Sequence, residues 1–398
     1  MNLCRIIACN FIPRLTLWHT VAGLILVLAL SLLAFTVTLS AQNAVSNEAI
    51  KLQHEGKLQE AAQVWQSVVS QNPKNAEAFA SLGTVFSKLK NFNQAAEAYR
   101  KALALDPKLP NVSLNLGVAE FKQAHFQAAV EPLKLALQAD PASTQARVLL
   151  ALSCYAAGRY AEVVAYLSPA VEADPSNTEL RQTLAQSSLW AGQYQRTLTE
   201  AQELLRQNPH SAPTRMLMGE ALDAMDKDDE AIDEFQAAAK ESPKEPNVHF
   251  ALGYLYWKQK EYDDAEREFR AELANDPEHS QSCAYLGDTL LRENNPSAAA
   301  PLLKKASQLR NDIRIAYLDL GIIYTEQKKY DEALKHLKHA EQIDPSRPDA
   351  HYRLARLYQD LGRQSEASQE FAKVSKLHED NTDDLLGKIA GSPARASN

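Results

Sequence analysis

Two histidines have the spacing that most suggests chemistry in this sequence. His336 and His339 lie three residues apart in "KHLKHAE", and on a helix this spacing places both imidazoles on one face, where they could hold a metal ion. Lys335 and Lys338 alternate with them, and nearby positive charges oppose the capture of a cation. We therefore expect both histidines to lie on a solvated helix face, and we predict no metal or other cofactor.

The remaining reactive side chains do not form a catalytic pattern. The acidic stretch "DAMDKDDEAIDEF" (223–235) lacks the glycine and the ligand spacing of a calcium loop, so we interpret it as a solvated turn or a partner-facing patch. Cys154 and Cys283 lie far apart without a CxxC pair, which favours two free, buried thiols over a zinc site or a disulfide. No Ser/His/Asp set, Walker-type loop or GxGxxG occurs in a fitting context. The sequence therefore predicts a protein that is not an enzyme and has no small-molecule substrate.

The charge of the chain argues against one further class of protein, the nucleic-acid binders. The chain has 398 residues and a net charge of −8, and its body is acidic, because residues 1–41 carry two arginines and no acid. A phosphate backbone is bound by a basic surface. Nucleic acid is therefore not an expected partner.

The N-terminus contains one long apolar run. "VAGLILVLALSLLAFTVTL" (21–39) has 19 residues without a charge, and Arg5 and Arg14 both precede it. A run of this length can cross a bilayer, and the positive-inside rule places the residues after 41 outside the cytoplasm. We predict a signal-anchor over residues 1–41, with the rest in the periplasm or cell envelope; the alternative is a cleaved signal peptide and export.

The positions that would carry any function are set by a period of 34 residues. Asp-Pro, Asn-Pro or Ser-Pro pairs recur at this spacing from Pro73 to Pro345, with one member missing at Asn311. Within each period, position 8 is always Gly or Ala, position 20 is Ala in eight of ten cases, and position 24 is usually large. Apolar residues at positions 4, 7, 8 and 11 predict a first helix, and those at 20, 24 and 27 predict a second helix packed against it. The ten repeats are 42–75, 76–109, 110–143, 144–177, 178–211, 212–245, 246–279, 280–313, 314–347 and 348–381, followed by a short capping helix and a loose tail over 382–398.

At the joint without proline, other residues must end one helix and begin the next. We expect Asn311 to adopt the left-handed conformation that ends a helix, and Asp312 to cap a helix that begins at Ile313. We also expect this joint to be softer than the others.

This pattern resembles the tetratricopeptide repeat. The segments "AFASLGTVFSKLKNFNQAAEAYRKALALDP" (78–107) and "AYLDLGIIYTEQKKYDEALKHLKHAEQIDP" (316–345) carry the resemblance, which covers residues 42–381. It implies an all-α fold, a right-handed superhelical solenoid of about ten helix-turn-helix repeats, whose first helices line a concave groove. It also implies a non-enzymatic scaffold that binds protein or peptide segments there.

In this family, positions 2, 5, 9 and 12 of the first helix face the groove. Two apolar-aromatic patches then flank an acidic stretch, which would suit a partner segment with apolar anchors and a central basic residue. The alternative is that these side chains pack on the neighbouring first helix and meet no ligand. The candidate residues are Leu114, Val118, Phe121, Val148, Leu152 and Tyr155 in the first patch, Glu220 and Asp223 in the acidic stretch, and Phe250, Tyr254 and Trp257 in the second patch.

The partner itself cannot be named from the sequence. The alternatives to a free-standing scaffold are a subunit of a cell-envelope assembly or export machine, and a non-catalytic partner subunit of an enzyme. Both require an obligate partner chain.

Overall fold

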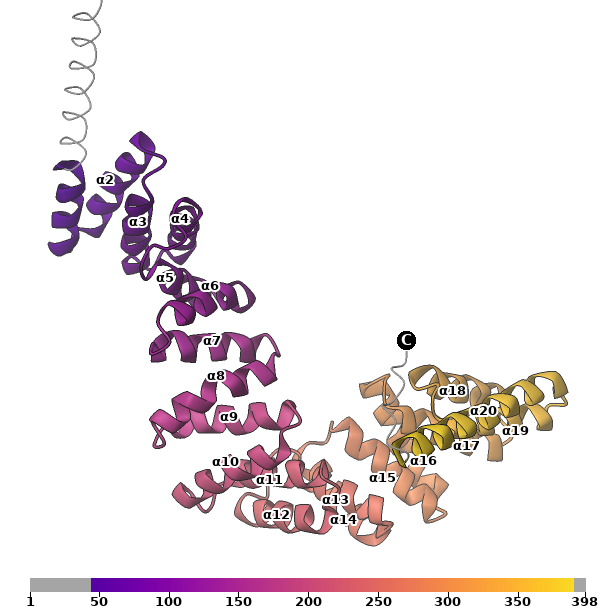
Figure 1. Cartoon of the computed structure of the whole chain (residues 1–398). Helices are drawn as coiled ribbons and strands as arrows, with labels where there is room; N and C mark the ends of the chain where they lie inside the picture. The colour runs from indigo at the N-terminus through magenta and orange to yellow at the C-terminus, as the bar shows by residue number, and fades with distance from the viewer. Residues whose placement is uncertain (1–43, 390–398) are drawn as a thin grey trace, which may run out of the picture. The chain divides into compact units, whose positions relative to one another are not determined.

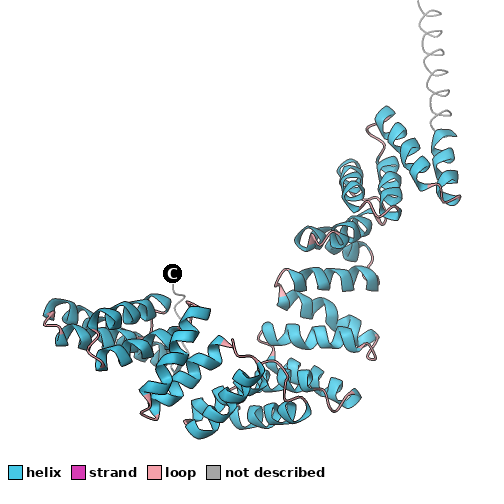
Figure 2. Ribbon diagram, turned by 180° about the vertical axis from the view of Figure 1, so that it is seen from behind, coloured by secondary structure: helices cyan, strands magenta, loops and turns pink. Residues whose placement is uncertain are grey.

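The protein is a succession of α-helical hairpins (Figures 1 and 2). The computed structural model describes residues 44–389, and their side chains over residues 44–379. Every regular element among the described residues is a helix, and none of these helices is both long and apolar enough to cross a membrane. The apolar run 21–39 lies outside the described residues.

The helices fall into two compact halves, Met1–Ala191 and Gly192–Asn398, which are described separately. The N-terminal half begins with a helical segment over residues 44–54. It continues with α2 (Leu58–Gln71), α3 (Ala76–Lys88), α4 (Phe92–Leu105), α5 (Val112–Lys122), α6 (Phe126–Ala139), α7 (Thr144–Ala156), α8 (Tyr160–Ala173) and α9 (Thr178–Trp190).

The C-terminal half repeats the same alternation and ends on a longer helix. Its last helix runs through residues 382–389, where the sequence suggested a separate capping helix. The helices are α10 (Tyr194–Gln207), α11 (Ala212–Asp223), α12 (Asp228–Glu241), α13 (Val248–Gln259), α14 (Tyr262–Asn275), α15 (Ser280–Arg292), α16 (Pro296–Leu309), α17 (Arg314–Glu326), α18 (Tyr330–Ile343), α19 (Pro348–Asp360) and α20 (Gln364–Ile389).

In the six hairpins with glycine at position 8, this residue approaches the large side chain at position 24 closely. A Cβ added to Gly253 would lie 2.7 Å from the Phe269 ring, and one added to Gly83 would lie 2.6 Å from the Tyr99 ring. Both rings are almost completely buried. The close approach predicted from the repeat is confirmed, and its cause is steric, because glycine leaves room for the partner ring.

The turn inside each hairpin uses a residue with positive φ. In all ten repeats this residue is at position 15. Only four of the ten are glycines, and others include Ala124 (φ 59°) and Lys260 (φ 65°). A residue with a Cβ pays a steric cost in this conformation, so tertiary packing rather than local preference fixes these turns.

At the five Asp-Pro joints, the second helix of the hairpin ends by two contacts. At Asp106, the backbone N–H donates to Ala102 O at 2.9 Å, and the side-chain Oδ1 accepts from the Lys108 N–H at 3.0 Å. The proline that follows has no N–H with which to continue the helix. The next first helix begins at a polar cap, such as Asn75 Oδ1, which accepts from the Ala78 N–H at 2.9 Å.

Position 4 differs from the predicted apolar stripe. In five repeats its side chain is an arginine or a histidine that donates to the carbonyl of the preceding joint proline, for example His351 Nε2 to Pro345 O at 3.0 Å. This carbonyl is close to the start of the first helix, so a long donor at position 4 reaches it. The five donors are Arg147, Arg181, Arg215, His249 and His351.

The joint without proline is built differently from the prediction. Asn311 is not among the described residues with positive φ, and the helix cap is Ile313, which has no side-chain capping bond. Asp312 pairs instead with Arg310. The Asn311 carbonyl accepts from His339 Nε2 at 2.9 Å. A histidine from the following hairpin therefore contacts this joint, where the other joints have proline.

Candidate functional site

The residues that most suggested chemistry have structural roles. His336 and His339 are half-buried. Both rings pack against Tyr317, whose ring centroid lies 6.0 Å from that of His336 and 4.2 Å from that of His339. Their Nδ1 and Nε2 atoms face separate backbone carbonyls, those of Glu332 and Asn311. The helix face that carries them is therefore only partly solvated, and each imidazole contacts a backbone carbonyl of its own.

The two cysteines of the described residues are buried and free. Burial raises the pKa of the Cys154 and Cys283 thiols, which lowers the thiolate fraction and with it the reactivity. The prediction of two apolar, unpaired cysteines is confirmed.

The first predicted patch lies in the N-terminal half and is partly used for internal packing. Its six residues are all half-buried. Phe121 packs edge-on against Phe126 of its own hairpin at 5.3 Å, and Tyr155 packs against Trp190 of the next first helix at 5.8 Å. Trp190 remains about half exposed. Binding of a ligand by Leu114, Val118, Phe121, Val148, Leu152 and Tyr155 stays a prediction.

The predicted acidic stretch lies in the C-terminal half and is largely neutralised there. Lys258 Nζ lies 3.0 Å from Asp223 Oδ1 and 2.8 Å from Asp228 Oδ1, and these carboxylates raise the pKa of Lys258. Loss of water around the Glu220 carboxyl raises its pKa, although the residue as a whole is exposed. Glu220 is thus the less satisfied of the two predicted acids.

The second predicted patch is organised around a residue that the sequence analysis did not name. The Tyr285 ring lies 5.9, 5.4 and 5.0 Å from Phe250, Tyr254 and Trp257. Burial raises the pKa of Tyr285 to about 12. Tyr285 is on α15, the next first helix, so all three predicted residues do pack on their neighbour, while each stays half-buried.

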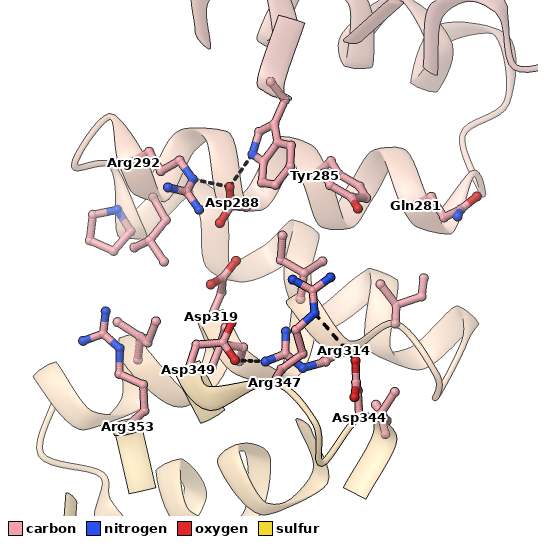
Figure 3. Close-up of a pocket in the computed structure, with 18 of the residues that line it drawn as sticks. Gln281, Tyr285, Asp288, Arg292, Arg314, Asp319, Asp344, Arg347, Asp349 and Arg353 are labelled. Carbon is pink, nitrogen blue, oxygen red and sulfur yellow. Dashed lines mark hydrogen bonds and ion pairs between the residues drawn. The ribbon is translucent and has the colours of Figure 1, made fainter. Parts of the chain in front are cut away.

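A cavity of about 910 Å³ adjoins this aromatic cluster (Figure 3). It lies within the C-terminal half and is lined by α15, α17, the start of α19 and the joints between them. Its apolar lining includes Ile315, Leu318 and Ile322, which share one face of α17 by their spacing. Trp257 and Tyr285 contribute aromatic surface beside it.

Most of the charged groups in the cavity wall are already paired. Asp288 pairs with Arg292, and Asp312 with Arg310. On the opposite wall in Figure 3, Arg314 contacts Asp349, and Arg347 Nε lies 3.7 Å from Asp344. Four arginines and four carboxylates thus neutralise one another.

Asp319 lies in the same wall and forms no ion pair with a described residue. It is 3% exposed, and its Oδ2 has no hydrogen-bond partner. The Asp288 carboxyl acts on it both by its charge and by a side-chain hydrogen bond, and Figure 3 shows the two side chains pointing toward one another. Burial, and then the Asp288 charge, raises the pKa of Asp319 well above its ordinary value.

One carboxylate oxygen of Asp288 accepts two hydrogen bonds. Its Oδ2 accepts from the Trp257 indole N–H at 2.6 Å and from Arg292 Nε at 2.5 Å. Its Oδ1 has no such donor among the described residues. The centre of the cavity therefore holds two adjacent carboxyl groups, and no described residue other than this pair itself offers a donor to Asp319 Oδ2 or Asp288 Oδ1.

The sequence carries a signal for this cavity at the first helix of the ninth repeat. Positions 2, 5 and 9 of the ninth repeat are Ile315, Leu318 and Ile322, the same groove positions that selected the two predicted patches. Asp319 is at position 6 and was not a candidate, because its lack of a partner depends on the neighbouring helix.

One further cluster has metal-ligand chemistry. Glu341, His351 and Glu370 bring three ligand atoms within 4.8 Å of one another. However, Lys373 Nζ already contacts both carboxylates, at 3.0 and 2.8 Å. His249 repeats the same arrangement, contacting Glu268 and Pro243 O. The cluster is explained as an ion-paired joint between hairpins.

Comparison with known families supports the reading of the repeats. Models described as tetratricopeptide repeat match 76–109, 120–187, 183–246, 216–280, 250–312, 284–348 and 324–389. Comparison with the curated proteins gives no match.

Several solved structures are similar at low identity. YrrB, described as a tetratricopeptide repeat protein with an unusual peptide-binding site, is 20% identical over 48% of this chain and 97% of that chain, with a TM-score of 0.38. PilF of Pseudomonas aeruginosa is 17% identical over 51% and 92%, with a TM-score of 0.47. The Cut9–Hcn1 hetero-tetramer of APC/C is 16% identical over 84% and 73%, with a TM-score of 0.43. The matches to the family models and the ten hairpins together show that the chain belongs to the tetratricopeptide repeat family.

Proposed function

We propose that this protein is a non-enzymatic scaffold that binds a segment of a partner protein on the first helices of its C-terminal half. The observation that supports this most directly is the cavity of about 910 Å³ between α15, α17 and α19. It has an apolar strip on α17, aromatic surface at one edge and paired charges around it. This composition is typical of a site for a protein segment.

The chemistry of the site favours binding over catalysis. The titratable groups that would be candidates for an acid or a base are the carboxyls of Asp288 and Asp319. No nucleophilic Ser, Cys or His lines the cavity among the described residues. We therefore assign the cavity to recognition.

A site-specific photo-crosslink tests this function. A photoreactive amino acid at Leu318, in the cavity wall, should crosslink a discrete partner protein when the full chain is irradiated in its native cells. The matched control is Leu135, an exposed leucine on α6. The proposal fails if Leu318 gives no crosslinked protein, or gives the same products as Leu135.

We further propose that the repeats work outside the cytoplasmic membrane, held by residues 1–41. This rests on the 19-residue apolar run and on the two arginines that precede it. A carbonate wash of membranes tests the anchor, because an integral segment resists extraction. Full release of the protein would favour a cleaved signal peptide instead.

A further inference from the structure

The pair formed by Asp288 and Asp319 has one contacting cation, Arg292, for its two carboxyl groups. Two carboxyl groups in contact repel one another when both are ionised, and burial strengthens the repulsion. Arg292 and Trp257 both contact Asp288 Oδ2, and Asp319 forms no ion pair among the described residues. An unpartnered carboxylate oxygen that is more than nine-tenths buried and faces a cavity is a costly feature.

The surroundings of this pair are apolar on both sides along α17. Ile315 and Ile322 lie four residues before and three residues after Asp319, so they flank it on the same helix face. Leu318 lies next to it in the same wall. The acid pair is therefore the polar centre of an apolar strip.

We propose, resting on the function proposed above, that the partner segment inserts a lysine side chain whose ammonium group lies between Asp288 and Asp319. Apolar residues on either side of this lysine cover Ile315, Leu318 and Ile322. The ammonium group donates to Asp319 Oδ2 and to Asp288 Oδ1, the two oxygens to which no described residue outside the pair donates.

A lysine fits this site better than the other charged ligands. Its four methylenes can lie along the apolar strip while the compact charge reaches the buried carboxyls. Four of the five arginines in the lining are already paired, with Asp288, Asp312, Asp344 and Asp349, and only Arg353 forms no ion pair with a described residue. An anionic ligand at the acid pair itself would be repelled by the two carboxyl groups. Charge complementarity thus selects a cation.

The test uses the full chain and a synthetic peptide library. The peptides are nonamers with randomised flanks and one fixed central residue, which is lysine in one pool, norleucine in the second and glutamate in the third. Norleucine is the matched control, because it keeps the aliphatic stem and removes the charge. Retention of each pool on the immobilised protein is measured by mass spectrometry at pH 7.5.

We expect wild-type protein to retain the lysine pool about tenfold more than the norleucine pool, as for a hydrogen bond to a charged group. In Asp319→Asn the two pools should be retained about equally, because the amide keeps the shape of the side chain and loses the charge. In Asp349→Asn, which alters an exposed acid of the same wall, the preference should persist.

Several outcomes would overturn the proposal. These are equal retention of the lysine and norleucine pools by wild-type protein, a preference for glutamate, and a lysine preference that survives Asp319→Asn. Occupation by the chain itself would appear as a dimer that Asp319→Asn dissociates, or as increased lysine retention after removal of residues 390–398. If crosslinking at Leu318 succeeds while the lysine preference is absent, the scaffold function stands and only this inference fails.

Discussion

Replacing Asp319 by asparagine should stabilise the C-terminal half at neutral pH. The side chain is 3% exposed and its Oδ2 has no partner, so the charged form carries a desolvation cost without compensation. The amide of asparagine has nearly the same shape, has no charge, and can donate to the Asp288 carboxyl. An unsatisfied buried polar group costs about 1–3 kcal/mol, and we expect a gain in the free energy of unfolding of that size.

The pH dependence gives this prediction a definite sign. The pKa of Asp319 is raised in the folded protein by burial and by the Asp288 charge, and is lowered less by Arg292 and Arg353. The folded state therefore binds the proton more tightly than the unfolded state, and wild-type stability falls as pH rises from about 4 through the folded pKa. The gain from Asp319→Asn should be present at pH 7 and should disappear below about pH 4.

The assay is urea denaturation of the full chain at several pH values, with hydrogen exchange of α15 and α17 as the local measurement. A local measurement is needed because repeat arrays do not always unfold in one step. The control is Asp312→Asn, in which Arg310 lowers the pKa of an exposed acid; its small effect should have the opposite sign and be lost as pH falls. The reasoning is refuted if Asp319→Asn is neutral or destabilising at pH 7.

Three further predictions concern the hairpins. Gly253→Ala should lower the free energy of unfolding by roughly 1 kcal/mol, because overpacking against Phe269 outweighs the gain in helix propensity; a rise in the urea midpoint would contradict this. Ala124→Gly should raise the free energy of unfolding by roughly 1 kcal/mol, because it removes the steric cost of a Cβ at positive φ. An unchanged melting temperature would show that the turn is not strained. His339→Ala should speed amide exchange in the 310–314 joint about fivefold, since it removes the donor to Asn311 O; unchanged exchange would mean that the joint does not depend on this contact.

The sequence by itself determined the fold of this protein. The 34-residue period places Gly253 against Phe269, and Gly83 against Tyr99, because both contacts lie within one hairpin and depend only on local spacing. The Asp-Pro joints act in the same local way, as the contacts of Asp106 with Ala102 and Lys108 show. Such features repeat with the chain and can be recognised in it.

Tertiary structure decided the features that depend on a neighbouring hairpin. The sequence shows Asn311 but not His339 as its partner, and it shows an acidic cluster but not Lys258, which neutralises Asp223. These partners lie about one repeat or more away, and no local pattern selects them.

The candidate site also combines features that the local sequence predicts with features that depend on a neighbouring hairpin. The groove positions of the ninth repeat, including Leu318, could have been predicted from the family pattern. The state of Asp319 could not, because its burial, its contact with Asp288 and its unpartnered oxygen arise only when α15 and α17 pack together. The sequence determined that Ile315, Leu318 and Ile322 share one face of α17, which lines the cavity, while the packing of adjacent first helices decided that Asp319 beside them has no ion pair.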